Sequence, residues 1–187
     1  IAKQEVLMKT ARKYGIRVMG PNCIGVIDRY NKVDTTFVET HLSQQDKGEP
    51  GGISFISQSG AVAASILMEG DSQPVPMQFN KFLSIGNMAD VDFIDLLEYL
   101  EDDENTKVIG IYMEGYPQAK KLIKTMARIA KKKPIVVLKV GKSEKGASAA
   151  NSHTGSLAGS DRVYDSIFKQ YGIMRVESIE DLIDTMQ

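Results

Sequence analysis

Short apolar runs alternate along the chain with longer stretches in which apolar residues recur at helical spacing. The apolar runs have the length of buried strands and lie at residues 53–57, 81–85, 108–113, 134–140 and 173–176. The helical patterns run from 61 to 68, after Asp92, from about 118 to 130, from about 161, and after Ser178. Strands separated by helices are typical of a parallel sheet with right-handed crossovers.

Helix boundaries in the sequence support this reading. Asp92 and Ser178 stand where an N-cap is needed, and Pro134 ends the helix before the fourth run, directly after three lysines that suit the helix C-terminus. We therefore predict an α/β domain with a doubly wound, five-stranded parallel sheet in the flavodoxin-like strand order 2-1-3-4-5. In that order, the third strand lies between the first and the fourth.

The first 45 residues do not fit this repeat. A helix over residues 3–14 and a strand over 16–19 lead to the run Gly-Pro-Asn-Cys-Ile-Gly at 20–25, and residues 28–50 are a polar connector. One helix and one strand cannot enclose a core of their own. We expect residues 1–45 to be the tail of a preceding α/β domain and residues 46–187 to be the flavodoxin-like domain.

Composition narrows the functional classes. The 187 residues are 42% hydrophobic, with 23 basic against 24 acidic side chains, which fits a globular enzyme or binding domain and gives no basic surface for nucleic acid. The apolar runs are too short to cross a membrane. A single cysteine, Cys23, fits the reducing cytoplasm. The chain begins at Ile1 without a methionine, so we expect a piece of a longer protein.

Candidate catalytic and binding residues lie at the predicted carboxyl ends of the strands, where α/β sheets bind ligands. His153 lies in a loop of small residues after the fourth strand, Glu114 follows the third, and Ser59-Gly60 begins a helix after the first. A carboxylate can fix the tautomer of an imidazole, and a helix N-terminus can stabilise an anion. Each feature also has a plainer interpretation, namely a loop histidine, a solvated glutamate and an ordinary helix cap.

Other candidates are weaker. Cys23 has no nearby histidine to activate it and is predicted to be a small buried residue, while His41 is predicted to be a solvated surface side chain. Asp90, Asp92 and Asp95 are interpreted as helix-capping residues. We predict no metal site in this chain, because two distant histidines and one cysteine do not form a ligand cluster.

Five segments in this order resemble the CoA-ligase region of ADP-forming acyl-CoA synthetases and the alpha subunit of succinyl-CoA synthetase. They are Gly-Pro-Asn-Cys at 20–23, Ile-Ser-Gln-Ser-Gly at 56–60, Asp-Phe-Ile-Asp-Leu-Leu-Glu at 92–98, Glu-Gly at 114–115 and Ser-His-Thr-Gly at 152–155. The resemblance covers essentially the whole chain. It implies that acyl-CoA, phosphate and ADP are converted to the free acid, CoA and ATP.

The resemblance also implies roles for single residues. His153 matches the histidine that carries the phosphoryl group, and Glu114 matches the carboxylate that orients it. Ser59, Gly60 and Gly155 match phosphate-binding positions. Gly20, Pro21 and Asn22 match a turn near the bound CoA, so residues 1–45 would be the end of a Rossmann-like CoA-binding domain.

The implied partners are an ATP-grasp domain or subunit, which would hold ADP or ATP and Mg²⁺, and a small organic acid or its CoA ester, in an oligomeric assembly. An alternative is a non-catalytic acyl-CoA-binding regulatory module, such as those fused to protein acetyltransferases. That branch typically lacks the phosphohistidine, whereas Ser-His-Thr-Gly is intact at 152–155. A flavin-binding domain is disfavoured, since Tyr116 is the one aromatic residue in the edge loops. The sequence leaves the acyl group open.

Overall fold

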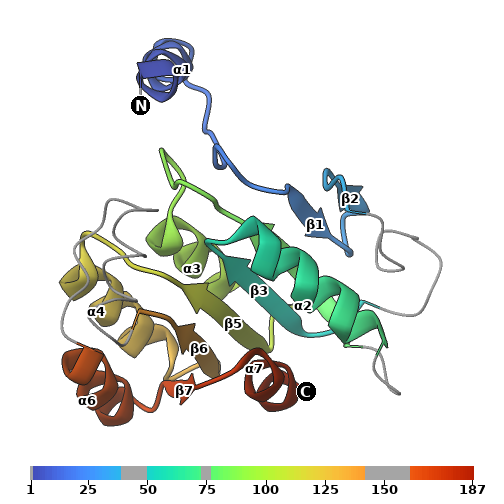
Figure 1. The fold of residues 1–187 in the computed structure, drawn as a ribbon, viewed down its shortest axis with the longest axis vertical. Helices are drawn as coiled ribbons and strands as arrows, with labels where there is room; N and C mark the ends of the chain where they lie inside the picture. The colour runs from blue at the N-terminus through green and yellow to red at the C-terminus, as the bar shows by residue number, and fades with distance from the viewer. Residues whose placement is uncertain (1, 39–49, 73–76, 142–160) are drawn as a thin grey trace.

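The computed structural model describes residues 2–38, 50–72, 77–141 and 161–187. Within these ranges the chain forms a seven-stranded sheet in the order β2-β1-β4-β3-β5-β6-β7, with helices on both faces (Figure 1). The parallel strands are β3 (Ile53–Ser57), β4 (Phe79–Ser84), β5 (Val108–Met113), β6 (Ile135–Lys139) and β7 (Met174–Val176). Their order is the predicted 2-1-3-4-5, so the flavodoxin-like topology is confirmed.

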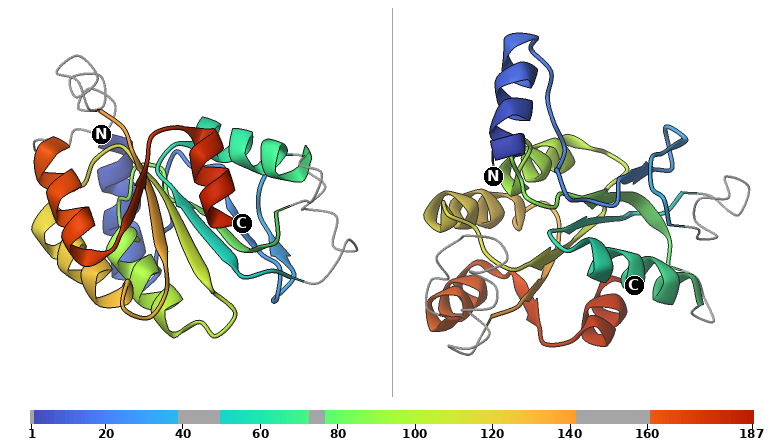
Figure 2. Two further views of the ribbon diagram at one scale, coloured as in Figure 1. Left: turned by 90° about the horizontal axis from the view of Figure 1, so that it is seen from below. Right: turned by 45° about the horizontal axis from the view of Figure 1, so that its top comes forward.

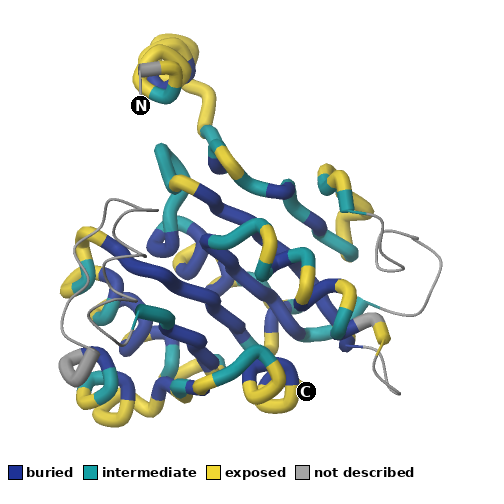
Figure 3. The backbone as a smooth tube through the Cα atoms, viewed as in Figure 1, coloured by how far each residue is buried: buried dark blue, intermediate teal, exposed yellow. Residues whose placement is uncertain are grey.

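Two layers of helices enclose the sheet because each helix buries one apolar face. On one face, α3 (Phe93–Asp102), α4 (Ala119–Ile129) and α6 (Asp161–Tyr171) pack in a single cluster that contains Phe93, Met126 and Phe168. On the other face, α2 (Gly60–Ser72) and α7 (Ile179–Met186) pack with Phe55 and Phe82 (Figure 2). All residues of β3, β4 and β6 are buried (Figure 3). The apolar run at 134–140 predicted this for β6, whereas β4 also buries the polar side chains of Asn80 and Lys81.

The predicted caps are present. The Asp92 side chain accepts hydrogen bonds from the backbone of Ile94 and Asp95, while the Asp95 carboxylate accepts from the Asp92 N–H, which completes a capping box for α3. Ser178 accepts from the N–H of Asp181 at the start of α7. Lys133, the last of the three lysines before Pro134, donates from its ammonium to the carbonyls of Leu100 and Asp103, both at 2.6 Å, at the end of α3.

The N-terminal part differs from the expectation in two respects. After α1 (Ala2–Lys13), residues 16–19 form no strand, and the predicted connector instead contributes to β1 (Val26–Asp28) and β2 (Val33–Asp34). These pair antiparallel with β4 and with each other, and extend the sheet. Strands of two and three residues are too short to show a recognisable alternation of apolar and polar positions, which explains why the sequence pattern missed them. α1 projects from the sheet (Figure 1).

No helix in the described ranges is both long enough and apolar enough to cross a membrane. The apolar residues instead line the two clusters on either side of the sheet.

A buried polar network lies at the amino end of the strands. Lys81, with its side chain only 3% exposed, donates to Asp103 at 3.0 Å and lies 3.5 Å from a carboxylate oxygen of Asp28. Thr106 and Asn80 also donate to Asp103, at 2.5 and 2.8 Å. Burial pushes the pKa of Asp103 upward, but the hydrogen bonds from Thr106, Lys81 and Asn80 outweigh it and lower the pKa to about 2. The network joins β1, β4 and the end of α3.

This carboxylate gives the fold an acid-sensitive contribution to stability. The pKa of Asp103 in the folded protein lies below its ordinary value of 3.8, so the contribution of its carboxylate to stability is present above that value and is lost as the pH falls toward 2. The shift corresponds to about 2 kcal/mol. In urea titrations at pH 6, we expect Asp103→Asn to have a lower free energy of unfolding than wild type. The difference between the two proteins should shrink between pH 4 and pH 2. The exposed neighbour Asp102→Asn is the matched control. An Asp103→Asn deficit that stays constant over this range would contradict the assignment.

Candidate active site

The parallel strands end at a common edge, and their following loops bring most of the predicted residues together. Ser59 and Gly60 follow β3, the loop 85–92 follows β4, and Glu114 follows β5. β5 lies directly between β3 and β6. His153 and Gly155 follow β6 in the sequence but lie outside the described residues, as does His41. The placement of His153 beside Glu114 therefore stays a prediction.

Glu114 is buried rather than solvated, with 8% of its surface exposed. Its backbone N–H donates to the Gln58 side chain at 2.7 Å, and its carbonyl accepts from Lys139 at 2.9 Å. Burial, and after it the negative charge of Glu114, raises the pKa of Tyr112. The Glu114 carboxylate is thus held in a sheltered position, where its electrostatic effect on neighbours is larger than in water.

The start of α2 is a capped helix N-terminus. The Ser59 hydroxyl accepts from the N–H of Val62 at 3.3 Å, and the Ser57 hydroxyl donates to the Ser59 carbonyl at 2.8 Å. The Ser59 hydroxyl oxygen is therefore already used to cap α2. An anion at this turn would interact with the free backbone N–H groups and with the positive end of the helix dipole. A Cβ atom on Gly60 would lie 2.9 Å from Ile24, so the turn packs directly on the segment after Gly20.

The Gly20–Pro21–Asn22 turn docks on the loop after β4. The carbonyls of Gly20 and Pro21 accept from the N–H groups of Ala89 and Asn87, both at 2.9 Å. Gly86 has φ +50°, and a Cβ atom there would lie 2.3 Å from the carbonyl oxygens of both Pro21 and Asn22. The approach is too close for any side chain, which explains the glycine. This turn thus lies at the same edge as Ser59 and Gly60.

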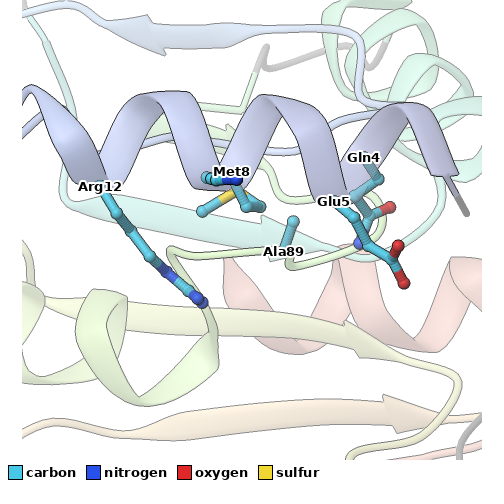
Figure 4. Close-up of a pocket in the computed structure, with 6 residues that line it drawn as sticks. Gln4, Glu5, Met8, Arg12 and Ala89 are labelled. Carbon is cyan, nitrogen blue, oxygen red and sulfur yellow. The ribbon is translucent and has the colours of Figure 1, made fainter.

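A groove of about 430 Å³ separates α1 from the loop after β4 (Figure 4). The groove is lined by Gln4, Glu5, Met8, Lys9, Arg12 and Ala89. Gln4 accepts from Asn87 at 3.1 Å, and Asn87 accepts from Asn22 at 3.3 Å, so α1 is connected to the Gly20–Pro21–Asn22 turn. The groove opens beside the turn that the family resemblance predicts to lie near CoA.

Further contacts fix the surrounding loops. Tyr116 donates a short hydrogen bond to Asp92, and burial followed by this bond raises the pKa of Tyr116, so the loop after β5 is fastened to the start of α3. Asp90 is not a helix cap, because it accepts from Arg17 at 2.9 Å and from the N–H of Val18 at 2.8 Å and so anchors the chain after α1. Cys23 is half-buried, not fully buried.

Sequence reasoning missed two side chains at this edge, Gln58 and Lys139. Gln58 stands inside the Ser-Gln-Ser-Gly turn, whose small residues alone indicate anion binding, and Lys139 ends an otherwise apolar strand. A lysine that ends a buried strand is the one signal that could have indicated a buried charge. Among the described residues, no group of three or more histidine, cysteine, aspartate or glutamate side chains is arranged to hold a metal ion.

Residues 50–187 match the family model described as the succinyl-CoA ligase like flavodoxin domain. The chain belongs to this family. It is 41% identical over 181 residues to the alpha subunit of acetate–CoA ligase [ADP-forming] II of Pyrococcus furiosus, and 44% identical over 179 residues to the acetate–CoA ligase [ADP-forming] of Methanocaldococcus jannaschii. These alignments cover 97% and 95% of this chain but 38% and 24% of the two relatives.

A solved structure supports the same membership in the succinyl-CoA ligase like family. Dinucleotide-forming acetyl-coenzyme A synthetase 1 of Candidatus Korarchaeum cryptofilum, in complex with phosphate and ADP, superposes with a TM-score of 0.84 at 40% identity, over 97% of this chain and 38% of that one. The chain therefore spans well under half the length of these relatives, and the activity of a whole protein that contains it is a matter for proposal.

Proposed function

We propose that this chain is the phosphohistidine-carrying part of an ADP-forming acyl-CoA synthetase in the cytoplasm, an acid–thiol ligase that converts acyl-CoA, phosphate and ADP to the acid, CoA and ATP. The observation that carries the proposal is the convergence of the α2 N-terminus, the buried Glu114 and the Gly20–Pro21–Asn22 turn at one sheet edge. Its relatives named as acetate–CoA ligases support the reaction class.

The chemistry proceeds by three transfers, and in each of them the bond that forms is matched by a bond that breaks. A phosphate oxygen attacks the thioester carbonyl, the C–S bond breaks, and CoA leaves as a thiolate that takes up a proton. A ring nitrogen of His153 then attacks the phosphorus of the acyl phosphate, the bond to the acyl oxygen breaks, and the carboxylate leaves. A terminal phosphate oxygen of ADP finally attacks the phosphorus, the N–P bond to His153 breaks, and the neutral imidazole is regenerated as ATP leaves.

The proposed site residues have distinct tasks in this reaction. The backbone N–H groups at Ser59 and Gly60 would hold the phosphate, since a helix N-terminus favours an anion, and Gly155 would contribute from the histidine loop. Glu114 would accept from one ring nitrogen of His153 and leave the other nitrogen free to attack. The Gly20–Pro21–Asn22 turn, beside the groove under α1, would hold the reactive end of acyl-CoA.

The nucleotide and Mg²⁺ belong, in this proposal, to an ATP-grasp domain or subunit with which the chain assembles into an oligomer. The greater length of the relatives is consistent with additional domains or subunits. Large apolar side chains lie exposed on and after α1, which supports contacts with further protein there: Val6 at 67%, Tyr14 at 65%, Ile16 at 60% and Phe37 at 78%. From the family resemblance we further propose that residues 1–45 are the end of a CoA-binding domain, which adds β1 and β2 to the edge of this sheet.

To test the proposal, acetyl-CoA, phosphate and ADP are added to the whole protein together with its ATP-grasp partner. We expect ATP and free thiol to appear in equal amounts, with neither formed when phosphate or ADP is omitted. A panel of other acyl-CoA esters then defines the acyl group. Tight binding of acyl-CoA without any ATP formation across the panel would instead favour the regulatory module.

A further inference from the structure

The backbone of Glu114 and Gly115 is hydrogen-bonded by two side chains, Gln58 directly after β3 and Lys139 at the end of β6. The Gln58 amide oxygen accepts from the N–H of Glu114 at 2.7 Å and from the N–H of Gly115 at 3.1 Å. The Gln58 amide nitrogen donates to the Gly115 carbonyl at 2.9 Å. The Lys139 ammonium donates to the Glu114 carbonyl at 2.9 Å. Every backbone donor and acceptor of the two residues therefore has a side-chain partner.

Strand register explains how these contacts arise. Gln58 directly follows β3, where Ser57 pairs with Tyr112, and the N–H of Gln58 donates to the Tyr112 carbonyl at 3.3 Å. Lys139 pairs with Met113, the residue before Glu114. The two side chains thus reach Glu114 from opposite sides, one from each neighbouring strand.

Both side chains are buried, which strengthens their hydrogen bonds to the backbone of Glu114 and Gly115. Gln58 is 4% exposed and Lys139 is 2% exposed, so water does not compete for their hydrogen bonds. A buried ammonium is costly, and an apolar side chain would fill the end of β6 at no such cost. Lys139 also donates a short bond to the Val140 carbonyl and lies 5.5 Å from the centre of the Tyr164 ring. The charge is therefore directed at the backbone where β5 and β6 end.

We propose that Gln58 and Lys139 are positioning residues that fix the Glu114 carboxylate for phosphoryl transfer through His153. The inference rests on the proposed function. Neither side chain needs to touch the phosphoryl group, because each acts on the Glu114 backbone. A displacement of about 1 Å at a catalytic group can lower the rate about a hundredfold. The hydrogen bonds from Gln58 and Lys139 to the Glu114–Gly115 backbone, called the clamp below, would prevent such a displacement.

A double-mutant cycle in the whole protein with its ATP-grasp partner tests the clamp. We expect Gln58→Met and Lys139→Met each to lower kcat for ATP formation by about tenfold to a hundredfold, with the KM for acyl-CoA changed by less than about threefold. In a Glu114→Gln background, the same changes should add less than about threefold, since they act through Glu114. The proposal would be overturned if Gln58→Met and Lys139→Met lowered kcat by the same factor in the Glu114→Gln background as in wild type.

Ser54→Ala is the matched control, because Ser54 is buried in β3, the strand that Gln58 follows, and shares a 2.8 Å hydrogen bond with Thr106. Ser54 lies near the amino end of that strand, away from Glu114. This substitution should leave kcat unchanged. If Gln58→Met fails to fold, Gln58→Glu keeps the accepting oxygen and replaces the donor to Gly115, and it should lower kcat in the same way. A normal kcat in Gln58→Glu would count against the clamp.

Amide hydrogen exchange separates failure of the clamp from failure of the proposed function. The amides of Glu114 and Gly115 should exchange at least tenfold faster in Gln58→Met than in wild type, whatever reaction the protein catalyses. If the wild type forms no ATP, but the two amides exchange faster in Gln58→Met than in wild type, the proposed function fails. The hydrogen bonds of Gln58 then hold the backbone without a role in catalysis. Unchanged exchange overturns the clamp itself.

Discussion

Replacing His153 by alanine should abolish acid-labile, base-stable labelling of the protein by γ-labelled ATP and lower ATP formation by on the order of a thousandfold or more. The reason is chemical, because covalent phosphoryl transfer stops when its nucleophile is removed and no other group replaces it. Acyl phosphate formation should survive in part, since phosphate is the attacking group in that step. The measurements are the amount of protein-bound label and the rate of ATP formation in the whole protein with its ATP-grasp partner.

His41→Ala is the matched control, because the chain contains two histidines and His41 belongs to the segment predicted to be a polar connector. It should label and turn over like wild type. Equal labelling of wild type and His153→Ala would contradict the phosphohistidine assignment. In that case the acyl-CoA-binding regulatory module becomes the better interpretation of the chain.

The central sheet could be predicted from the sequence because its signals are local. Each buried strand is a short apolar run, and Asp92 and Ser178 act on backbone groups only two or three residues away. Strand order then follows from the alternation of strands and helices. The short strands β1 and β2 were missed, because β1 forms by pairing with β4 some fifty residues away along the chain, and β2 in turn pairs with β1.

The site was predictable only in part, for the same reason. The sequence placed Ser59, Gly60 and Glu114 at one edge, since every strand-to-helix loop of a parallel sheet lies there. It did not indicate the roles of Gln58 and Lys139, which reach Glu114 across separations of 56 and 25 residues through strand register. It also did not indicate that the Ser59 hydroxyl would be occupied by its own helix, which transfers any anion contact to the backbone.

Glu114→Gln should slow phosphoryl transfer to His153 by about tenfold to a hundredfold and leave the fold nearly unchanged. The hydrogen bonds that Gln58 and Lys139 make with this residue involve its backbone N–H and carbonyl, which the substitution retains. What changes is the side chain, since an amide carries no charge to stabilise a ring that gains positive charge as it attacks phosphorus. The rate of protein labelling by γ-labelled ATP, followed by rapid quenching, measures the step directly.

Glu101→Gln provides the matched control, because Glu101 is 7% exposed against 8% for Glu114 but lies between α3 and α4, 2.6 Å from Lys132 and paired with Arg128. Its loss removes buried charge pairing and should destabilise the fold by about 1 to 3 kcal/mol while the labelling rate stays at the wild-type value. The two substitutions should therefore give opposite results, with Glu114→Gln lowering the rate at nearly constant stability and Glu101→Gln lowering stability at constant rate. Labelling at the wild-type rate in Glu114→Gln would mean that another group orients His153, and the same result would remove the reason for a clamp on Glu114.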